Sequence, residues 1–549
     1  MKSERRAAIL PTLKRLIRLI VCLILVSTWD VVAYPGSAAA QGPLPVPGGA
    51  SLFFPPYVST NDRIGFAQVL GGLSDYDVAR LNAGWYVNWN TAASPSRPFG
   101  LAFVQTIRLH GSGRSCLRAC TAYKPACDGI IDYGSCRSGF PADPASVSVK
   151  PSRDTIRSVA AANPGSLWMI GNEQDRILYQ DDVCPDEYAL VYHELYELIK
   201  AADPTARVAI GGVVPATPIR LQYLDIVRCA YQSTYGVSLP VDLWNVHAFV
   251  LNEQAGSWGA ELPPGMVTAS RAQRRNQWDS DDMDLFGQQI VDFRKWMNAR
   301  GERNKPLIVS EYGVLQPTWL CDGDPSYSHP SCGAHNGRSY NFSCASVFMR
   351  NTFDYFRNTT DSGTGYPGDG NRLVQAWNWY SLDNDRNYGG NLFFSTSKQI
   401  TILGSDFATY VTPLKVSYVD LLAWNLSTDY RADLFDGDPV TVTVSGQVFN
   451  MGNQGASNVL VRLWNGQPGV GTRMGGDRYV ANVRLRYQDQ GAVPTVVGTW
   501  SGVATSVQSF YLEVNPEHTI GESQYGNNVL CISISLGTAR LHLPVVHKS

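Results

Sequence analysis

The chain has 549 residues, of which 44% are hydrophobic and 17% are charged, with a formal net charge of −2 at pH 7. This length exceeds one ordinary domain, and the composition supports a large buried core, which excludes a largely disordered protein. The nearly neutral charge also argues against a nucleic-acid partner, because such a partner requires a basic surface.

The first 40 residues predict an export signal. A basic start from Lys2 to Arg18 precedes a short apolar core, Leu19–Val26, and Ala38–Ala40 fits the small-residue cleavage pattern. The short apolar run argues against a complete membrane span, although an uncleaved anchor remains an alternative. We therefore expect a secreted or cell-surface protein, with an N-terminal linker over residues 41–61.

Short apolar runs alternate with amphipathic stretches from residue 62 to residue 424. Several of these runs are rich in Val, Ile and aromatic residues, which is typical of buried parallel strands. Eight of them predict strands: Ile64–Val69, Gly84–Trp89, Ala102–Leu109, Ser166–Gly171, Val208–Gly212, Leu243–Phe249, Leu307–Ser310 and Leu373–Trp379.

Helical spacing appears between and after these strands. The expected helices are Asp75–Asn82, Pro151–Ala162, Asp186–Ala202, Met283–Ala299, Asn341–Phe356 and Asp406–Leu422. Repeated strand-then-helix units over this length predict an α/β fold, a (β/α)8 TIM barrel. A doubly wound open sheet would also alternate, but no Gly-rich phosphate loop follows the first strand.

Three strand-to-helix connections, over residues 111–150, 250–282 and 314–339, are too long for plain turns and should build a cleft at the C-terminal face. Cysteines gather in or beside the first and third. Because no pair has CxxC spacing and export favours oxidation, we favour disulfides over a zinc site. The two groups are Cys116, Cys120, Cys127 and Cys136, and Cys321, Cys332 and Cys344.

Two glutamates follow apolar runs at the ends of the fourth and seventh predicted strands. Glu173 ends Ser166-Leu-Trp-Met-Ile-Gly-Asn-Glu, and Glu311 ends Pro306-Leu-Ile-Val-Ser-Glu. Strands 4 and 7 lie on opposite sides of an eight-stranded barrel, so these carboxylates should face each other across its mouth. Such a pair can cleave a glycosidic bond, and a separation of about 5–5.5 Å permits the retaining reaction.

With Gly171-Asn172-Glu173 and Ser310-Glu311-Tyr312-Gly313 at these two strand ends, residues 60–424 resemble the clan A TIM-barrel retaining glycoside hydrolases, which include cellulases, mannanases, β-galactosidases and β-xylosidases. The resemblance implies that Glu173 is the acid/base and Glu311 the nucleophile. An ionised Glu311 would raise the pKa of Glu173, as a general acid requires. A helix cap or an ion pair is the alternative role for either residue alone.

Neighbouring strand ends provide candidate substrate-binding residues. The resemblance implies that Asn172 binds the sugar 2-hydroxyl, that His247 lines the cleft, and that Trp377 lies under the sugar ring. Arg108 could hold Glu311 ionised or form a structural ion pair. The remaining candidates are Trp379 as an alternative platform, Tyr312 beside the nucleophile, and the weaker Trp89, Asn90, Trp258 and Trp319.

Beyond residue 424 the pattern changes to that of an all-β module. We expect a linker over residues 425–438, a sandwich over 439–536 and a tail over 537–549. Predicted strands are Val440–Val444, Val459–Leu463, Val483–Tyr487, Val496–Val503, Ser509–Val514 and Val529–Ile534.

The segments Val448–Gly455 and Val514–Ser523, with Asn527-Asn528, resemble CARDB-type immunoglobulin-like modules. Such a module could serve as a spacer, as an adhesion unit for a cell-surface glycan, or as a carbohydrate binder, and we favour a spacer or adhesion.

Together these patterns predict an exported, monomeric retaining β-glycoside hydrolase that acts on an oligo- or polysaccharide and uses neither a metal nor an organic cofactor. The alternative is a non-catalytic glycan-binding or adhesion protein that keeps the barrel as a platform. The paired glutamates distinguish the two, because a binding protein has no need of both.

Overall fold

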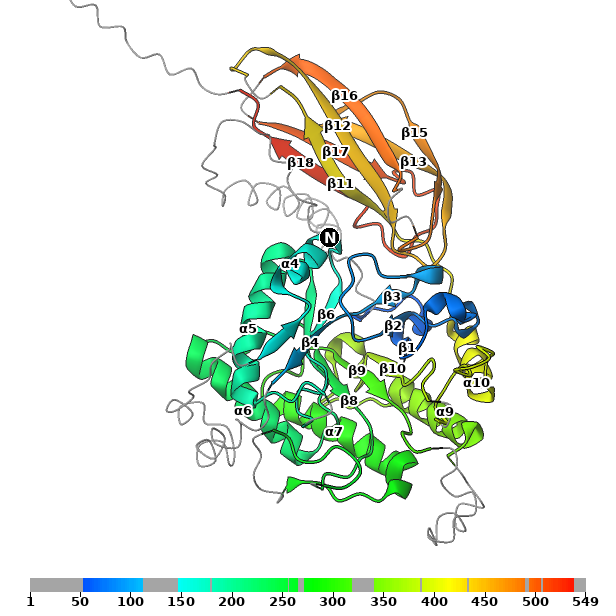
Figure 1. The fold of residues 1–549 in the computed structure, drawn as a ribbon. Helices are drawn as coiled ribbons and strands as arrows, with labels where there is room; N and C mark the ends of the chain where they lie inside the picture. The colour runs from blue at the N-terminus through cyan, green and yellow to red at the C-terminus, as the bar shows by residue number, and fades with distance from the viewer. Residues whose placement is uncertain are drawn as a thin grey trace, which may run out of the picture.

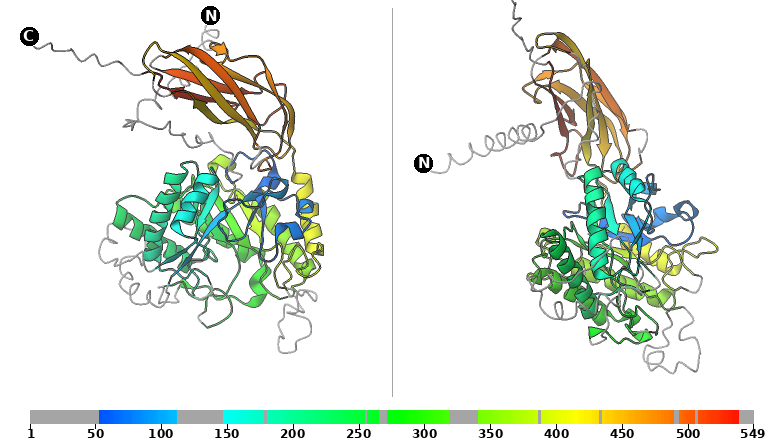
Figure 2. Two further views of the ribbon diagram at one scale, coloured as in Figure 1. Left: turned by 45° about the horizontal axis from the view of Figure 1, so that its top comes forward. Right: turned by 60° about the vertical axis from the view of Figure 1, so that its left-hand side comes forward.

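The computed structural model describes residues 53–111, 147–177, 180–254, 256–264, 271–317, 340–385, 388–431, 434–488, 493–504 and 507–537. These residues form a mixed α/β part and an all-β part (Figure 1). Two further views show the all-β part at one end of the α/β part (Figure 2). No helix among the described residues is long and apolar enough to cross a membrane.

All eight strands that we predict for the α/β part are present, and the ladders that they form with one another are parallel. One predicted strand, Ala102–Leu109, is interrupted at Val104 and gives β3 and β4. The strands are β1 (Ile64–Ala67), β2 (Trp85–Val87), β3 (Ala102–Phe103), β4 (Gln105–His110), β6 (Leu167–Ile170), β7 (Arg207–Ile210), β8 (Trp244–His247), β9 (Leu307–Tyr312) and β10 (Ala376–Trp379).

These strands form two sheets. One has the order β3-β2-β1-β10-β9-β8, and the other has the order β5-β4-β6-β7, in which the short β5 (Ser148–Lys150) is antiparallel to β4. Two isolated parallel bridges connect the β7 and β8 regions. Ala209 of β7 pairs with Leu243, just before β8, and Val213, after β7, pairs with Val246 of β8. The sheets are therefore adjacent at β7 and β8, and at β3 and β4, which are separated by one residue.

The helices lie between successive strands, as the alternating pattern predicts, except that α6 is absent from our prediction. Its residues Ile219, Tyr223, Val227 and Ala230 have helical spacing and are buried, so the signal is present in the sequence. The helices are α4 (Arg153–Ala162), α5 (Pro185–Ala202), α6 (Pro218–Tyr235), α7 (Met283–Ala299), α9 (Phe342–Asn358) and α10 (Ile402–Val411).

Two predicted helices differ from the structure. The segment Asp75–Asn82 forms two short 3-10 turns, Leu73–Asp75 and Val78–Leu81, rather than one α-helix. The segment Asp406–Leu422 is helical only as far as Val411 in α10, and a 3-10 turn, Thr412–Leu414, follows it. Pro413 lacks a backbone N–H, which is consistent with the end of the α-helix there.

The C-terminal part consists of two antiparallel sheets around its own core. One has the order β11-β12-β16, and the other has the order β14-β13-β17-β18 with β15 also paired to β13. The strands are β11 (Leu421–Asp429), β12 (Pro439–Asn450), β13 (Ala456–Asn465), β14 (Thr472–Arg473), β15 (Arg478–Val483), β16 (Thr495–Val503), β17 (Gln508–Val514) and β18 (Val529–Ile534).

The boundary between the two parts lies earlier than we predict. Strand β11 pairs with β12 from Leu421 to Asp429, and Val419, Leu421 and Ala423 belong to the C-terminal core. Residues 425–429 of the predicted linker are therefore part of a sandwich strand. After the buried Leu421–Ala423, Leu426 is the one further buried position of this strand, and its other residues are polar or partly exposed, so its second half has the composition of a linker.

Most cysteines of the two predicted clusters lie outside the described residues. Cys184 and Cys229, which belong to neither cluster, are disulfide-bonded. Cys344 lies on α9, where its Sγ is 3.4 Å from Asp281 Oδ2. The long connections over residues 111–150 and 314–339 also lie largely outside the described residues.

Candidate functional site

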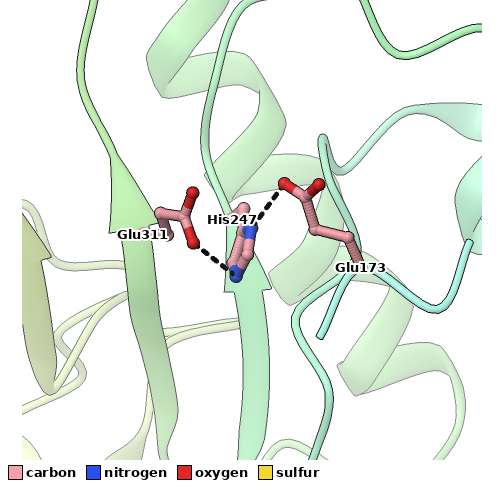
Figure 3. Close-up of side chains that lie close together, drawn as sticks. All are labelled: Glu173, His247 and Glu311. Atoms are coloured by element: carbon pink, nitrogen blue, oxygen red, sulfur yellow. Dashed lines mark hydrogen bonds and ion pairs between the residues drawn. The ribbon is translucent and has the colours of Figure 1, made fainter. Parts of the chain in front are cut away.

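The structure brings Glu173 and Glu311 together, as we predict. Glu173 lies three residues beyond β6, and Glu311 lies within β9. One carboxylate oxygen of each, together with one ring nitrogen of His247, lie within 4.8 Å of one another. All three residues are buried (Figure 3). This separation matches the short carboxylate spacing of retaining glycosidases rather than the about 6.5–9.5 Å that inversion requires.

A β-bulge directs Glu311 into the site. Leu307 and Val309 pack in the cluster that includes helix residues, whereas Ile308 packs in the cluster between the strands. Strict alternation would therefore turn Glu311 toward the helices and Tyr312 toward the site. The register of β9 shifts against both β8 and β10 at this point, and such an extra residue reverses the alternation.

Glu173 is held in a strained backbone conformation. Its φ is +48°, in the left-handed region that residues other than glycine rarely adopt. Its N–H donates to the Gly212 carbonyl at 3.1 Å, and its carbonyl accepts from the Arg176 N–H at 3.0 Å, which closes a tight turn after β6. Strain of this kind is concentrated at functional sites, where the surrounding structure maintains it.

His247 at the end of β8 separates the two carboxylates. Its Nδ1 is 3.0 Å from Glu173 Oε1, and its Nε2 is 3.8 Å from Glu311 Oε2. The ring packs against Gly212, where an added Cβ would lie 2.3 Å from His247 Cδ2. We expect His247 to line the cleft, but the structure encloses it completely, so it contacts the glutamates and presents no surface to a sugar.

Charged neighbours favour the ionised form of Glu173. Arg176 Nη1 donates to Glu173 Oε2 at 3.1 Å, and Arg176 Nη2 donates to the Gly259 carbonyl at 3.2 Å. Burial acts to raise the pKa of Glu173, but the hydrogen bond and charge of His247, together with Arg176, lower it below its ordinary value. Our expectation of a raised pKa for Glu173 is therefore wrong.

Glu311 has the opposite tendency. Trp89 Nε1 donates to its Oε2 at 3.2 Å. Burial raises the pKa of Glu311 to about 7 against the attraction of His247, and the charge of Glu173 contributes to the rise. For His247, burial lowers the pKa, but the charges of Glu311 and Glu173 outweigh this and raise it overall. The proton that these groups share is thus favoured on Glu311 or on His247 rather than on Glu173.

The three side chains also have the spacing of a metal site, each offering one ligand atom. Nδ1 of His247, however, is at hydrogen-bond distance from Glu173, and Nε2 faces Glu311. Each nitrogen is therefore directed at one carboxylate rather than at a point that all three groups share, so the arrangement fits proton exchange better than coordination.

Arg108 and Asn172 contact Asp181 and Gln180, and no contact of either with Glu311 is present among the described residues. Arg108 Nε donates to Asp181 Oδ1 at 2.8 Å, which is the structural ion pair that we considered as its alternative role. Asn172 donates through its backbone N–H to Asp181 and through Nδ2 to Gln180 Oε1 at 3.3 Å. The prediction that Arg108 holds Glu311 ionised is wrong, because Arg108 forms its ion pair with Asp181.

The structure encloses Trp377 and Tyr312, two predicted substrate-binding residues, in the core. Trp377 is fully buried against Phe353 and Phe356 of α9. Tyr312 is fully buried against Phe286 and accepts a hydrogen bond from Thr352 at 3.2 Å. Trp379 is also buried, so neither tryptophan of β10 can lie under a sugar ring. Both strands direct these large side chains toward the helices.

Of the weaker candidates that lie within the described residues, Trp89 is the one that contacts a catalytic-site glutamate, Glu311. Asn90 is exposed, and its side chain bonds the Asn88 carbonyl within a local turn. Trp258 is half-buried beside the segment around Ala260, and Trp319 lies outside the described residues.

Two residues at the site escape the sequence prediction. Arg176 follows Glu173 by three residues, and the polar run from Asn172 to Arg176 is its visible signal. Tyr380 follows β10, and its half-buried ring lies 6.0 Å from Trp89. Burial raises the pKa of the Tyr380 hydroxyl, and the charges of Glu311 and then Glu173 add to this, which places Tyr380 beside both. The alternation Trp377, Asn378, Trp379, Tyr380 would have indicated that Tyr380 points away from the helices.

No protein-family model matches the sequence, and no curated protein matches it significantly. Among solved structures, a GH128 (subgroup I) endo-β-1,3-glucanase from Amycolatopsis mediterranei in complex with laminaritriose is similar, with 14% identity, a TM-score of 0.35, and coverage of 63% of this chain and 98% of its own. A glucosidase from Croceicoccus marinus has 10% identity, a TM-score of 0.36 and coverage of 80% and 93%.

The C-terminal part is similar to the CARDB domain of the PF1109 protein from Pyrococcus furiosus, with 16% identity, a TM-score of 0.17, and coverage of 22% of this chain and 96% of that domain. Similarities at these identities and TM-scores decide neither fold nor activity, so both are argued from the residues of this chain.

Proposed function

We propose that this chain is an exported β-glycoside hydrolase that cleaves O-glycosidic bonds with retention by double displacement. The observation that carries the proposal is the approach of two buried carboxylates, Glu173 and Glu311, to within 4.8 Å at the carboxyl ends of parallel strands. That spacing leaves no room for the water that an inverting enzyme activates between the carboxylate and the sugar.

The proposal includes a (β/α)8 barrel as the frame for these residues. Parallel pairs connect β1 with β2, β2 with β3, β4 with β6, and β6 with β7. They continue through β8, β9 and β10 back to β1. Two isolated bridges between the β7 and β8 regions, and the chain itself between β3 and β4, supply the remaining connections.

In the proposed reaction Glu311 attacks the anomeric carbon, and Glu173 protonates the departing oxygen. This forms a glycosyl-enzyme ester and releases the leaving group. Glu173 then removes a proton from water, which attacks the ester and frees Glu311. Trp89 Nε1, which donates to Glu311 Oε2, orients the nucleophile, and the aromatic pair Trp89 and Tyr380 supplies the apolar wall for the sugar.

A screen of aryl β-glycosides and β-glycans, including β-1,3-glucan and β-1,4-mannan, tests the activity, and anomer-resolved analysis of the products tests retention. Glu311→Ala should abolish hydrolysis of an activated aryl glycoside, and azide should restore turnover with an inverted glycosyl azide. If azide restores nothing while the variant remains folded, Glu311 is not the nucleophile.

Glu173→Ala tests the second role. It should slow substrates with poor leaving groups by about 10²–10⁴-fold but slow dinitrophenyl glycosides much less, because a good leaving group needs no proton. Equal losses with both substrates would contradict the acid/base assignment. A glycan-binding protein without catalysis would bind β-glycans in both the wild type and the variants and would release no product.

Export is proposed from residues 1–40 alone, which lie outside the described residues. Expression of the full chain with N-terminal sequencing of the product tests it, and Gln41 is the expected first residue. Retention of the leader in a membrane fraction would support the anchor instead.

A further inference from the structure

His247 is enclosed between the two glutamates and, among the described residues, has a hydrogen-bond partner on one side only. Nδ1 lies 3.0 Å from Glu173 Oε1, whereas Nε2 is buried, has no hydrogen-bond partner in the described part of the chain, and is directed at Glu311 Oε2, 3.8 Å away (Figure 3). Gly212 packs against the ring so closely that the ring leaves no room for a side chain at position 212. The imidazole therefore connects the two carboxylates through opposite nitrogens.

We call Glu173, His247 and Glu311 the triad. The other ionisable groups around the triad have hydrogen-bond or ion-pair partners of their own. Asp175 lies near both His247 and Glu173, but it pairs with Arg220 at 2.8 Å and accepts the Val214 N–H. Arg176 donates to Glu173, and the Tyr380 hydroxyl accepts from Asn384 Nδ2 at 2.9 Å. Exchangeable protons inside the triad can thus move among Glu311 Oε2, the two nitrogens of His247, and Glu173 Oε1.

The proton distribution of the unliganded site is opposite to what the proposed reaction needs. Burial raises the pKa of Glu311, whereas His247 and Arg176 overcome burial and lower the pKa of Glu173. The nucleophile is therefore favoured as the acid and the proton donor as the carboxylate. Double displacement requires Glu311 ionised and Glu173 protonated before the first bond breaks.

We propose that His247 relays a proton from Glu311 to Glu173 when a glycoside enters the site. This inference rests on the proposed function. Glu311 Oε2 gives its proton to His247 Nε2, and His247 Nδ1 gives its proton to Glu173 Oε1. The ring begins and ends neutral, and one proton has been transferred between the carboxylates. His247 does not touch the sugar in this scheme and acts as a positioning residue for protons.

The distance of 3.8 Å between Nε2 and Glu311 Oε2 exceeds that of a hydrogen bond, so the relay requires the Glu311 carboxylate to approach the ring. Catalytic hydrogen bonds are often long in unliganded enzymes and shorten with substrate. After the ester is hydrolysed, Glu173 holds the proton taken from water and Glu311 is ionised. The enzyme is then ready for another cycle, and the relay runs backward only when the site empties.

Two substitutions at His247 separate a relay from simple support. His247→Asn retains an amide near the Nδ1 position and can still contact Glu173, whereas His247→Gln reaches toward the Nε2 position and Glu311. Neither amide can accept a proton on one side while releasing one on the other. His193→Gln is the matched control, because His193 packs against Tyr235 on the helix layer, far from the site chemistry.

The readout is the pH dependence of kcat/KM for a dinitrophenyl β-glycoside, which needs an ionised nucleophile but no acid. For the wild type and for His193→Gln, kcat/KM should not change with pH below pH 7, because the relay removes the proton from Glu311. Both His247 variants should lose about tenfold in kcat/KM per pH unit below the pKa of Glu311. Loss by one constant factor at every pH would overturn the relay and leave His247 a structural support.

Failure of the relay and failure of the proposed function give different results. If the wild type cleaves no β-glycoside, the proposed function fails. If it cleaves with retention and the His247 variants keep a level profile, only the relay fails. Should both variants not fold, ¹⁵N NMR of the ring nitrogens in the wild type and in Glu311→Gln provides the test. The relay predicts that one histidine changes its protonated nitrogen when Glu311 is replaced, and an unchanged spectrum would overturn it.

Discussion

Two groups of buried charges in this molecule are built in different ways. At the junction of the two parts, Arg486 is almost fully buried and donates hydrogen bonds from all three of its guanidinium nitrogens. Nη2 donates to Asp62 Oδ1 at 2.6 Å, Nη1 to the Tyr418 hydroxyl at 3.0 Å, and Nε to the Gly100 carbonyl at 2.8 Å. The Tyr418 hydroxyl in turn donates to Asp62 Oδ2 at 2.9 Å. Each of the three guanidinium nitrogens therefore has an acceptor.

The triad at the candidate site lacks this completeness. Within the described residues, Nε2 of His247 has no hydrogen-bond partner. The Glu311 carboxylate accepts one hydrogen bond there, from the Trp89 N–H. A buried charge with all its partners is fixed, because any change leaves a polar atom unsatisfied. Incomplete pairing, in contrast, lets a proton or a carboxylate move. The comparison suggests that the junction provides rigidity and the site provides exchange.

The two groups also lie at opposite ends of the strands. Asp62 precedes β1 and Gly100 precedes β3, whereas Glu173 follows β6 and Glu311 lies near the end of β9. The C-terminal part therefore contacts the amino ends of the strands and leaves the carboxyl ends, where the glutamates lie, uncovered (Figure 1). This placement favours a spacer or an adhesion unit over a module that extends the substrate site.

The largest effect that we expect is on stability, from Arg486→Met. Removal of the guanidinium leaves Asp62 buried and unpaired, and breaking such a pair typically costs about 3–5 kcal/mol. Chemical denaturation with kcat measured in parallel should show a lower free energy of unfolding with the activity of the folded enzyme retained. Arg431→Met, whose side chain is 63% exposed, is the control and should change little. A loss of kcat without a loss of stability would contradict the structural role.

Gly212→Ala should disturb the site without replacing either glutamate. The added Cβ would lie 2.6 Å from His247 Nε2, so the ring must move. A displacement of about 1 Å at such a site can cost about 10²-fold in rate. Steady-state kinetics should show the loss mainly in kcat. Gly72→Ala is the control, since its Cβ would make only ordinary contacts, the nearest at 3.4 Å from Ser74 Oγ.

Glu311→Gln should stabilise the fold at higher pH, the opposite sign from Arg486→Met. Burial raises the folded pKa of Glu311 from its ordinary 4.5 to about 7, so its favourable contribution is complete below pH 4.5 and is lost as the pH rises through 7. A neutral amide avoids this loss and should gain on the order of 2 kcal/mol at pH 8 relative to the wild type. Denaturant unfolding at pH 4 and pH 8 measures the difference.

Glu197→Gln, on an exposed position of α5, is the control for this experiment and should give no such pH-dependent gain. A Glu311→Gln variant that is less stable than the wild type at pH 8 would mean that Glu311 is held by partners as complete as those of Arg486. The contrast between the two groups would then disappear.

The sequence predicted the strands and the approach of the two glutamates, because apolar runs and the order of elements determine both. It did not predict which face Tyr312 and Trp377 occupy. A one-residue bulge in β9 reverses the alternation after Ser310, and nothing in Ile308-Val309-Ser310-Glu311 marks its position. The partners of Arg108 and Arg486 were also beyond reach, because Asp181 and Asp62 become neighbours only through tertiary contacts.

Arg176→Met should produce the smallest change that we expect. It should shift the alkaline limb of the pH profile of kcat/KM. Arg176 lies 3.1 Å from Glu173, and loss of a nearby positive charge raises the pKa of a carboxyl group. Glu173 should then retain its proton to higher pH, and the alkaline limb of kcat/KM for a substrate with a poor leaving group should move up by roughly one pH unit. Arg176→Lys keeps the charge and should leave the limb nearly in place.

The direction of that shift decides which carboxyl group the limb reports. An upward shift means that the limb follows Glu173, the partner of Arg176, as the proton donor. The charge of Arg176 also lowers the pKa of Glu311, but it is the last of the causes there and no hydrogen bond adds to it, so a limb that follows Glu311 should move much less. An unmoved limb in Arg176→Met would therefore assign the acid to Glu311 and exchange the two proposed roles, while the carboxylate pair itself and its separation would stand.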